Sequence, residues 1–105
     1  MNEILKLKRM LEADNIPFDF NDRMFGGTVP AYLIIIRDIN TGEQMCDAIF
    51  FEGSLGHSCG LLEIMGGLTR DEENDSDVLG WLTAEEVYKR FKYCYYHNTK
   101  YYVKD

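Results

Sequence analysis

Hydrophobic positions near the start of the chain recur with the period of an α-helix. In residues 3–14, Ile4, Leu7 and Leu11 fall on one helical face, and the charged residues fall largely on the others. The pattern predicts an amphipathic helix of about three turns. Pro17 disfavours helical backbone in the residue before it, so the helix should end near residue 15.

A second amphipathic helix is predicted in the last quarter of the chain. Thr83 and Glu86 have the spacing of a capping box, in which each side chain accepts a hydrogen bond from the other residue's backbone N–H. Val87, Phe91 and Cys94 then recur on one face, which predicts that this face packs on the core.

Runs of β-branched and aromatic residues between these helices predict strands. Residues 32–39 and 45–51 flank a turn in which Gly42 supplies a positive φ, a strong signature of an antiparallel hairpin. The first of these runs is apolar on both faces, which predicts a central strand. Residues 16–20 alternate like a short edge strand, and residues 78–82 suit a short extended segment.

The remaining segments are less regular. Residues 53–60 form a glycine-rich loop, residues 61–65 suit a single helical turn, and residues 69–77 are polar and acidic. Trp81 is expected in the core. Together the elements predict one α+β domain over residues 1–105, a three- to four-stranded antiparallel sheet with an N-terminal and a C-terminal helix packed on one face.

Negative charge is concentrated in the middle of the chain. The net charge is −7, yet residues 38–86 carry twelve acidic residues and a single base, Arg70, while the two ends together are net positive. An acidic chain lacks the basic footprint that nucleic acid phosphates require, so direct nucleic acid binding is not expected. Such asymmetry instead favours steering toward a basic partner.

The cysteines and the apolar runs indicate the compartment. Cys46, Cys59 and Cys94 are odd in number and lack framework spacing, which favours reduced thiols in a cytoplasmic protein. The longest apolar run, residues 31–36, is too short to span a bilayer. The charged N-terminal residues do not suit a signal peptide.

One sequence pattern suggests a possible zinc site. His57-x-Cys59 and Cys94-x-x-His97 contain zinc-ligand types, but the spacing matches no known knuckle and Cys94 falls on a core face. We therefore expect no metal and no cofactor, with zinc at these four residues left as an alternative.

The glycine-rich loop suggests two possible functions, phosphate binding and nucleophilic catalysis. It contains no lysine, and Glu52 and Glu63 on either side would repel an anion. Ser54 and His57 lack the strand–turn–helix elbow of a hydrolase nucleophile. We expect no enzymatic activity.

Two further segments keep alternatives open. The acidic residues 71–77 lack the spacing of an EF-hand; they suit either a solvated loop or a contact with a basic groove, where carboxylates replace phosphates. The tyrosine-rich end suits either core packing or an interface, and residues 101–103 suit an added edge strand.

Three segments together resemble a known family. They are Gly-Ser-Leu-Gly at 53–56, Leu-Leu-Glu-Ile-Met-Gly-Gly-Leu-Thr at 61–69, and Val-Leu-Gly-Trp-Leu-Thr-Ala-Glu-Glu-Val at 78–87. In this order they resemble small uncharacterised proteins of phages and prophages of gut Firmicutes, over roughly residues 45–92. The resemblance brings no catalytic residues with it.

The resemblance implies a phage anti-defence protein of the anti-CRISPR kind in the cytoplasm of a bacterial host cell. Such a protein would inhibit a CRISPR RNA-guided nuclease by binding its positively charged nucleic-acid channel. Alternatives are a sponge for a nucleotide-derived immune signal, held by bases such as Lys89, Arg90 and Lys92, and a structural or regulatory phage protein. The partner-binding acidic face is expected to comprise Asp38, Glu43, Asp47, Glu52, Glu63, Asp71, Glu72, Glu73, Asp75 and Asp77.

Overall fold

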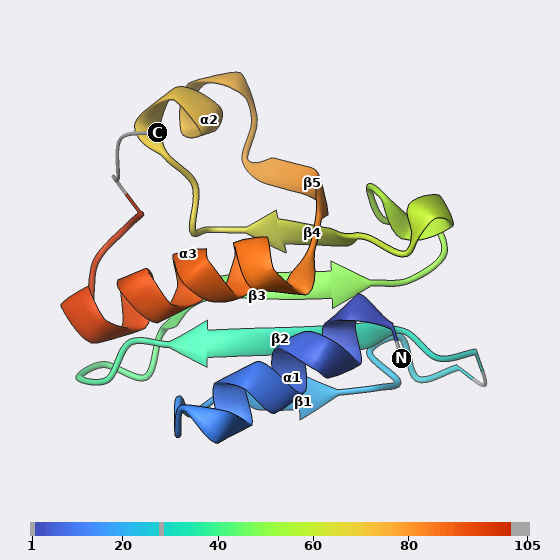
Figure 1. Cartoon of the computed structure of the whole chain (residues 1–105), viewed down its shortest axis with the longest axis horizontal. Helices are drawn as coiled ribbons and strands as arrows, with labels where there is room; N and C mark the ends of the chain where they lie inside the picture. Colours follow the sequence, from blue (N-terminus) through green and yellow to red (C-terminus); the bar gives the residue numbers. More distant parts are fainter. Residues whose placement is uncertain (1, 28, 102–105) are drawn as a thin grey trace.

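One antiparallel sheet of five strands dominates the computed structural model, which describes residues 2–27 and 29–101 (Figure 1). The strands follow one another across the sheet in chain order, so each pairs with its neighbour in sequence. They are β1 (Asp19–Asn21), β2 (Tyr32–Arg37), β3 (Gln44–Phe50), β4 (Leu62–Met65) and β5 (Val78–Leu82).

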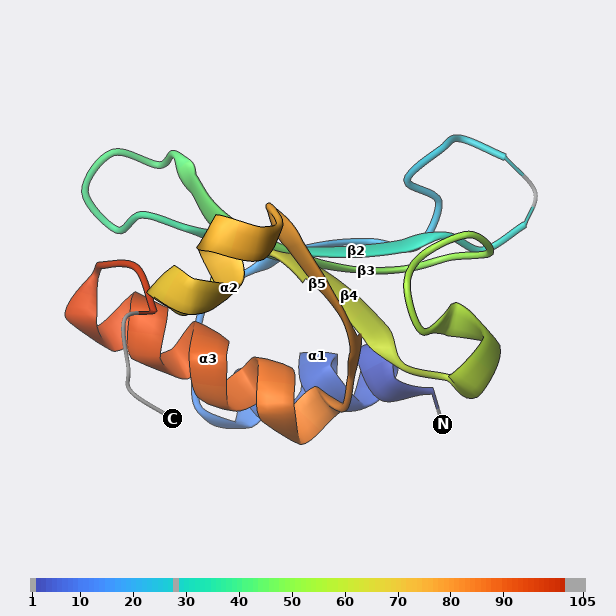
Figure 2. The same ribbon diagram turned by 90° about the horizontal axis from the view of Figure 1, so that it is seen from above.

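Two long helices cover a single face of this sheet. Figure 2 shows α1 (Glu3–Ala13) and α3 (Ala84–His97) side by side on that face. Two short helices, η1 (His57–Cys59) and α2 (Arg70–Asp75), lie in the connections on either side of β4. The prediction of terminal helices on one face of an antiparallel sheet is confirmed. Within the described residues, no helix is long and apolar enough to cross a membrane.

The core lies between the sheet and the two helices. Ile34 pairs with Ala48 and Ala48 pairs with Ile64, so these three side chains form a row across the middle strands. All three are fully buried, as is Phe91 of α3, which packs in the same cluster. Because side chains alternate along a strand, the same pairing directs the residues between them to the opposite face.

Polar contacts at the helix starts fix how the helices meet. The Thr83–Glu86 capping box is present as predicted. Asn2 caps α1, its Oδ1 accepting from the Leu5 amide at 2.9 Å. Glu3 of α1 accepts a hydrogen bond from the Ala84 amide at 2.9 Å, so one carboxylate joins the first turns of both helices.

The structure corrects the sequence prediction in three places. Residues 61–65, expected as a helical turn, contain strand β4, because Ile64 pairs with Ala48 on one side and Leu79 on the other. The sheet therefore has five strands. The first strand begins at Asp19, later than expected, and α2 forms inside the expected acidic loop because Thr69 and Glu72 make a second capping box.

Candidate functional site

The sheet face opposite the two helices is not covered by any other helix or strand of the described chain. Figure 2 shows this open face, with the turn after β2 and the β1–β2 connection rising on its side at the two ends of the sheet. The strand pairing assigns nine residues to the open face: Asp19, Asn21, Leu33, Ile35, Asp47, Ile49, Glu63, Met65 and Val78.

Apolar and acidic side chains alternate across the open face. Ile35 pairs with Asp47, and Ile49 pairs with Glu63, so each carboxylate lies beside an aliphatic side chain on the neighbouring strand. Met65, next to Asp47, is 49% exposed. A surface with this mixture combines apolar area for burial with charges that select a partner.

The basic group at the edge of the open face is already neutralised. Arg37 donates from Nε to Asp19 Oδ2 at 2.6 Å and from Nη1 to the Gly42 carbonyl at 3.1 Å. This contact joins the end of β2 to β1 and to the hairpin turn. The guanidinium therefore makes its contacts with Asp19 and the hairpin turn, and does not pair with the carboxylates in the middle of the open face.

Asp47 and Glu63 are the uncompensated charges of the open face. Burial of the half-buried Asp47 raises the pKa of its carboxyl, the negative charge of Glu63 raises it further, and the Gln44 amide, which donates to the carboxylate, opposes the rise. Glu63 Oε1 accepts from the Leu55 amide at 2.8 Å. Among the described residues, neither carboxylate forms an ion pair. An incoming cation would stabilise both.

Leu55 and Trp81 form an exposed apolar corner beside Glu63. Trp81 is 55% exposed and Leu55 is 44% exposed, and the Trp81 amide donates to the Leu55 carbonyl at 3.3 Å. The expectation that Trp81 lies in the core is wrong. A bulge in the β4–β5 pairing, between Leu62 and Ile64, gives Trp81 a φ of 63° and turns it outward.

Two glycines are needed to build this corner. A Cβ on Gly80 would lie 2.2 Å from the Leu55 Cβ, and a Cβ on Gly56 would lie 2.9 Å from the Trp81 backbone. Neither position can hold a larger residue without movement of the corner. A bulky residue with positive φ is strained, and such strain persists where the surrounding structure fixes it. The backbone of the corner therefore holds the apolar side chains of Leu55 and Trp81 in fixed positions at the surface.

The other predicted acidic residues on the hairpin and loops lie outside the open face. Asp38 accepts from the Asn40 amide at 2.7 Å and the Thr41 amide at 2.9 Å, and these backbone hydrogen bonds lower the pKa of its carboxyl. Asp38 therefore holds the turn between β2 and β3. Glu43 is exposed just before β3, and Glu52 is exposed after its other end.

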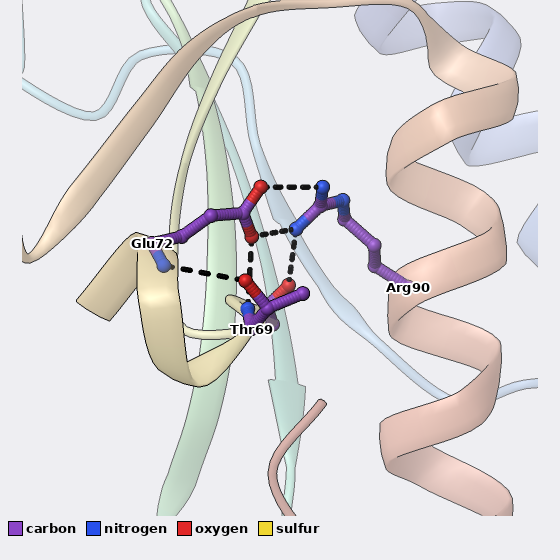
Figure 3. Close-up of polar contacts among 4 residues, drawn as sticks. Thr69, Glu72 and Arg90 are labelled. Atoms are coloured by element: carbon purple, nitrogen blue, oxygen red, sulfur yellow. Dashed lines mark hydrogen bonds and ion pairs between the residues drawn. The ribbon is translucent and has the colours of Figure 1, made fainter. Parts of the chain in front are cut away.

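In the acidic stretch 71–77, Glu72 lies against α3, whereas Glu73 and Asp77 line a pocket that Met65 of the open face also lines. Figure 3 shows Glu72 in a two-pronged ion pair with Arg90, with N···O distances of 2.6 and 2.9 Å, while Glu72 also caps α2 with Thr69. Arg90 lowers the pKa of the Glu72 carboxyl through these hydrogen bonds and its charge. Glu72 therefore has a structural role.

The neighbouring acids of this stretch differ in their contacts. Glu73 Oε1 lies 3.8 Å from Lys100 Nζ, whereas Asp71, Asp75 and Asp77 are exposed. Of the ten predicted contact residues, the structure brings together only Asp47 and Glu63 on the open face.

The residues considered for catalysis or metal binding either make other contacts within the fold or differ in their exposure to solvent. Ser54 is buried, and its hydroxyl both donates to the Phe51 carbonyl at 2.8 Å and accepts from the Phe51 amide. His57 packs on the Phe50 ring at 4.5 Å. Cys94 is buried and Cys59 exposed. The described residues contain no group of three or more His, Cys, Asp or Glu side chains placed to hold a metal ion.

The tyrosine-rich end packs partly into the fold. Tyr101 is buried, with the Arg90 guanidinium 5.1 Å from its ring centre and Tyr93 in an edge-on contact. Tyr96 is 58% exposed. The predicted edge strand 101–103 falls largely on residues outside those described.

Comparison with known proteins provides no evidence about the function of this chain. No family model, curated protein or solved structure matches this chain. The open face was not identified from the sequence, because the apolar residues on both faces of the run 32–39 predicted only a central strand. The signal was present in β3 and β4, where Asp47 and Glu63 alternate with buried residues.

Proposed function

We propose that this protein works by binding, and that its open face docks on a basic and partly apolar surface of another protein. The observation that carries the proposal is the pair of uncompensated carboxylates, Asp47 and Glu63, set among Leu33, Ile35 and Ile49. Arginine or lysine side chains of a partner would form charge-assisted hydrogen bonds with them. The aliphatic side chains would lose water in the same step.

The charge of the open face favours a different protein over a second copy of this chain. Two copies placed face to face would bring Asp47 and Glu63 of each near the same carboxylates of the other, and the whole chain already carries a net charge of −7. Like charges in contact across an interface oppose association. A basic partner instead gains in both affinity and association rate.

The exposed corner supplies an apolar anchor beside these charges. Trp is enriched among the residues that contribute most to protein–protein affinity, and Trp81 is fixed in a strained backbone next to Leu55. We therefore expect the partner to offer an apolar pocket next to its basic patch, within reach of Trp81.

The more specific proposal is that the partner is an RNA-guided nuclease and that the protein is a phage anti-defence factor. Its support is the sequence resemblance and the acidic surface, since such nucleases hold nucleic acid in positively charged channels. The alternative of a sponge for a nucleotide-derived signal receives less support. Arg90 is paired with Glu72, and Lys92 Nζ lies 3.1 Å from Asp14 Oδ2, so two of the three bases invoked for it are engaged.

A cleavage assay tests the proposal. Purified protein is mixed with a panel of CRISPR effectors, and target cleavage, DNA binding and complex formation are measured at low and high salt. We expect inhibition of at least one effector by a complex that weakens as salt rises. A panel with no inhibition and no salt-sensitive complex would contradict the nuclease proposal.

Matched variants separate the open face from the acidic stretch. Asp47→Asn with Glu63→Gln removes two charges from the open face, whereas Asp71→Asn with Asp75→Asn removes two exposed charges of α2. We expect the first pair to weaken the complex about tenfold per carboxylate and the second pair to leave it nearly unchanged. The reverse result would place the contact on the acidic stretch.

A further inference from the structure

Two buried thiols face each other between the sheet and the helix layer. Cys46 lies on the covered side of β3, and Cys94 lies on the inner side of α3. Each residue is only 2% exposed, and the thiols are close enough that each changes the pKa of the other. The third cysteine, Cys59, is exposed in η1.

The backbone around Cys46 is held firmly in place. Gly66 packs so closely that a Cβ added to it would lie 2.8 Å from the Cys46 Cβ and 2.5 Å from the Met45 carbonyl oxygen. Cys46 also sits in a strand paired on both sides, opposite Ile36 of β2. Cys46 and Cys94 are thus buried in neighbouring elements of one molecule, which favours bond formation within that molecule over bonds between molecules.

A small oxidant has a route to this pair. A partly open cavity of about 280 Å³ is lined by Cys94 together with Met45, Gly66 and Asn98. A cavity of this volume admits a molecule as small as hydrogen peroxide, and the low exposure of Cys94 disfavours attack by a bulky disulfide reagent.

The two thiols have different chemical roles. The proximity of the Cys46 thiol and the charge of Arg90 lower the pKa of the Cys94 thiol, while the proximity of Cys94 and burial raise the pKa of the Cys46 thiol. Thiolate is the reactive form of cysteine, so Cys94 is the thiol suited to attack first.

We propose that Cys46 and Cys94 are a redox site at which hydrogen peroxide forms a disulfide between β3 and α3. The Cys94 sulfur attacks one peroxide oxygen and breaks the O–O bond, giving a sulfenic acid and one water. The Cys46 sulfur then attacks the Cys94 sulfur and displaces a second water as the S–S bond forms. In total, two thiols are oxidised and one peroxide is reduced to two waters.

The bond would join the helix layer to the sheet. It closes a loop from residue 46 to residue 94, which restricts the unfolded chain and raises the denaturant concentration needed for unfolding. This inference does not depend on the proposed binding function, since it concerns the covered side of the sheet.

Mass analysis of a Cys59→Ser variant tests the site without interference from the exposed thiol. The variant is treated with hydrogen peroxide at neutral pH, unfolded, alkylated and digested with trypsin. We expect a loss of two hydrogens from the intact mass and a cross-link between the tryptic peptides 38–70 and 93–100, each of which then holds one cysteine. A rise in the urea midpoint that is reversed by a thiol reductant should accompany it.

A second variant and a competing outcome keep the test decisive. Cys46→Ser in the same background should instead stop at oxygen addition on Cys94, since the second thiol is missing. If the folded Cys59→Ser protein keeps two alkylatable thiols after peroxide treatment, or forms only linked dimers, the proposal is wrong. Circular dichroism confirms that the proteins compared are folded.

Discussion

Two neighbouring residues of β2 show how differently the two faces of the sheet are used. Ile34 points to the helices and is fully buried in a cluster with Ala48, Ile64 and Phe91. Ile35 points to the open face, where its partners across the sheet are Asp19 and Asp47. The covered face is largely apolar, while the other face mixes aliphatic side chains with carboxylates and is left open.

The difference separates stability from recognition. Covered positions contribute to folding through burial and close packing. The half-buried Asp47 carboxylate, which has no ion-pair partner, lies on the open face, and the strained Trp81 lies in the corner beside it. Both contribute little to folding or oppose it. Features that cost stability and persist are typical of functional surfaces.

The largest expected effect comes from the matched pair Ile34→Ala and Ile35→Ala. Ile34→Ala leaves a cavity in the core and should lower the free energy of unfolding by about 2–5 kcal/mol. Ile35→Ala removes a half-exposed side chain and should cost less than half as much. Urea denaturation measures both, and equal losses would show that the open face is part of the folding core.

The corner beside Glu63 should be sensitive to a single methyl group. Gly80→Ala places a Cβ against Leu55 and should cost about 1–3 kcal/mol through overpacking. Gly60→Ala is the control, because its Cβ meets nothing within 4 Å and only the positive φ opposes it, at about 1 kcal/mol. A Gly80 variant as stable as wild type would mean that the corner is mobile rather than rigid.

The ion pair on the helix side gives a pH-dependent effect. Glu72→Gln removes the charge facing Arg90 and should cost about 1–2 kcal/mol at neutral pH. The folded pKa of Glu72 is lowered, so its contribution is present above the ordinary pKa of about 4.3 and disappears as pH falls through the lower folded value. Denaturation from pH 7 to 3 should show the two proteins converging in acid; a constant difference would contradict this role.

Substitution of Trp81 should change the stability least and lower the affinity for a partner most. Trp81→Gly relieves a positive φ, which offsets the lost side-chain contacts, so stability should stay within about 1 kcal/mol of wild type. The affinity for a partner of the open face should fall more than tenfold if Trp81 is an anchor. A strong loss of stability with unchanged affinity would assign Trp81 to the fold instead.

The sequence predicted the covered half of the molecule better than the open half. Helical periodicity and the Thr83 cap identified α3, and the turn at Gly42 identified the β2–β3 hairpin, because these signals are local. Strand β4 was missed because four residues ended by glycines carry little periodicity. Its identity comes from pairing on both sides, which is a property of the tertiary fold.

The candidate site was predictable only in part. Acidic charge pointed to a basic partner, but the sequence does not show that Glu72 is paired with Arg90 or that Asp38 holds a turn. Trp81 was expected inside because large apolar residues usually are, and only the bulge in β5 reverses it. Which charges are engaged and which are unpaired depends on contacts distant in sequence.

The most direct measurement is an NMR titration of the isotope-labelled protein with a short synthetic peptide that alternates arginine with leucine. It distinguishes the open face from the acidic stretch near α2 as the preferred site for a basic, apolar partner. We predict amide shift changes centred on Leu33, Asp47, Ile49 and Glu63 that weaken with added salt. Changes confined to residues 71–77, or spread over the exposed sides of α1 and α3, would contradict the assignment of binding to the open face.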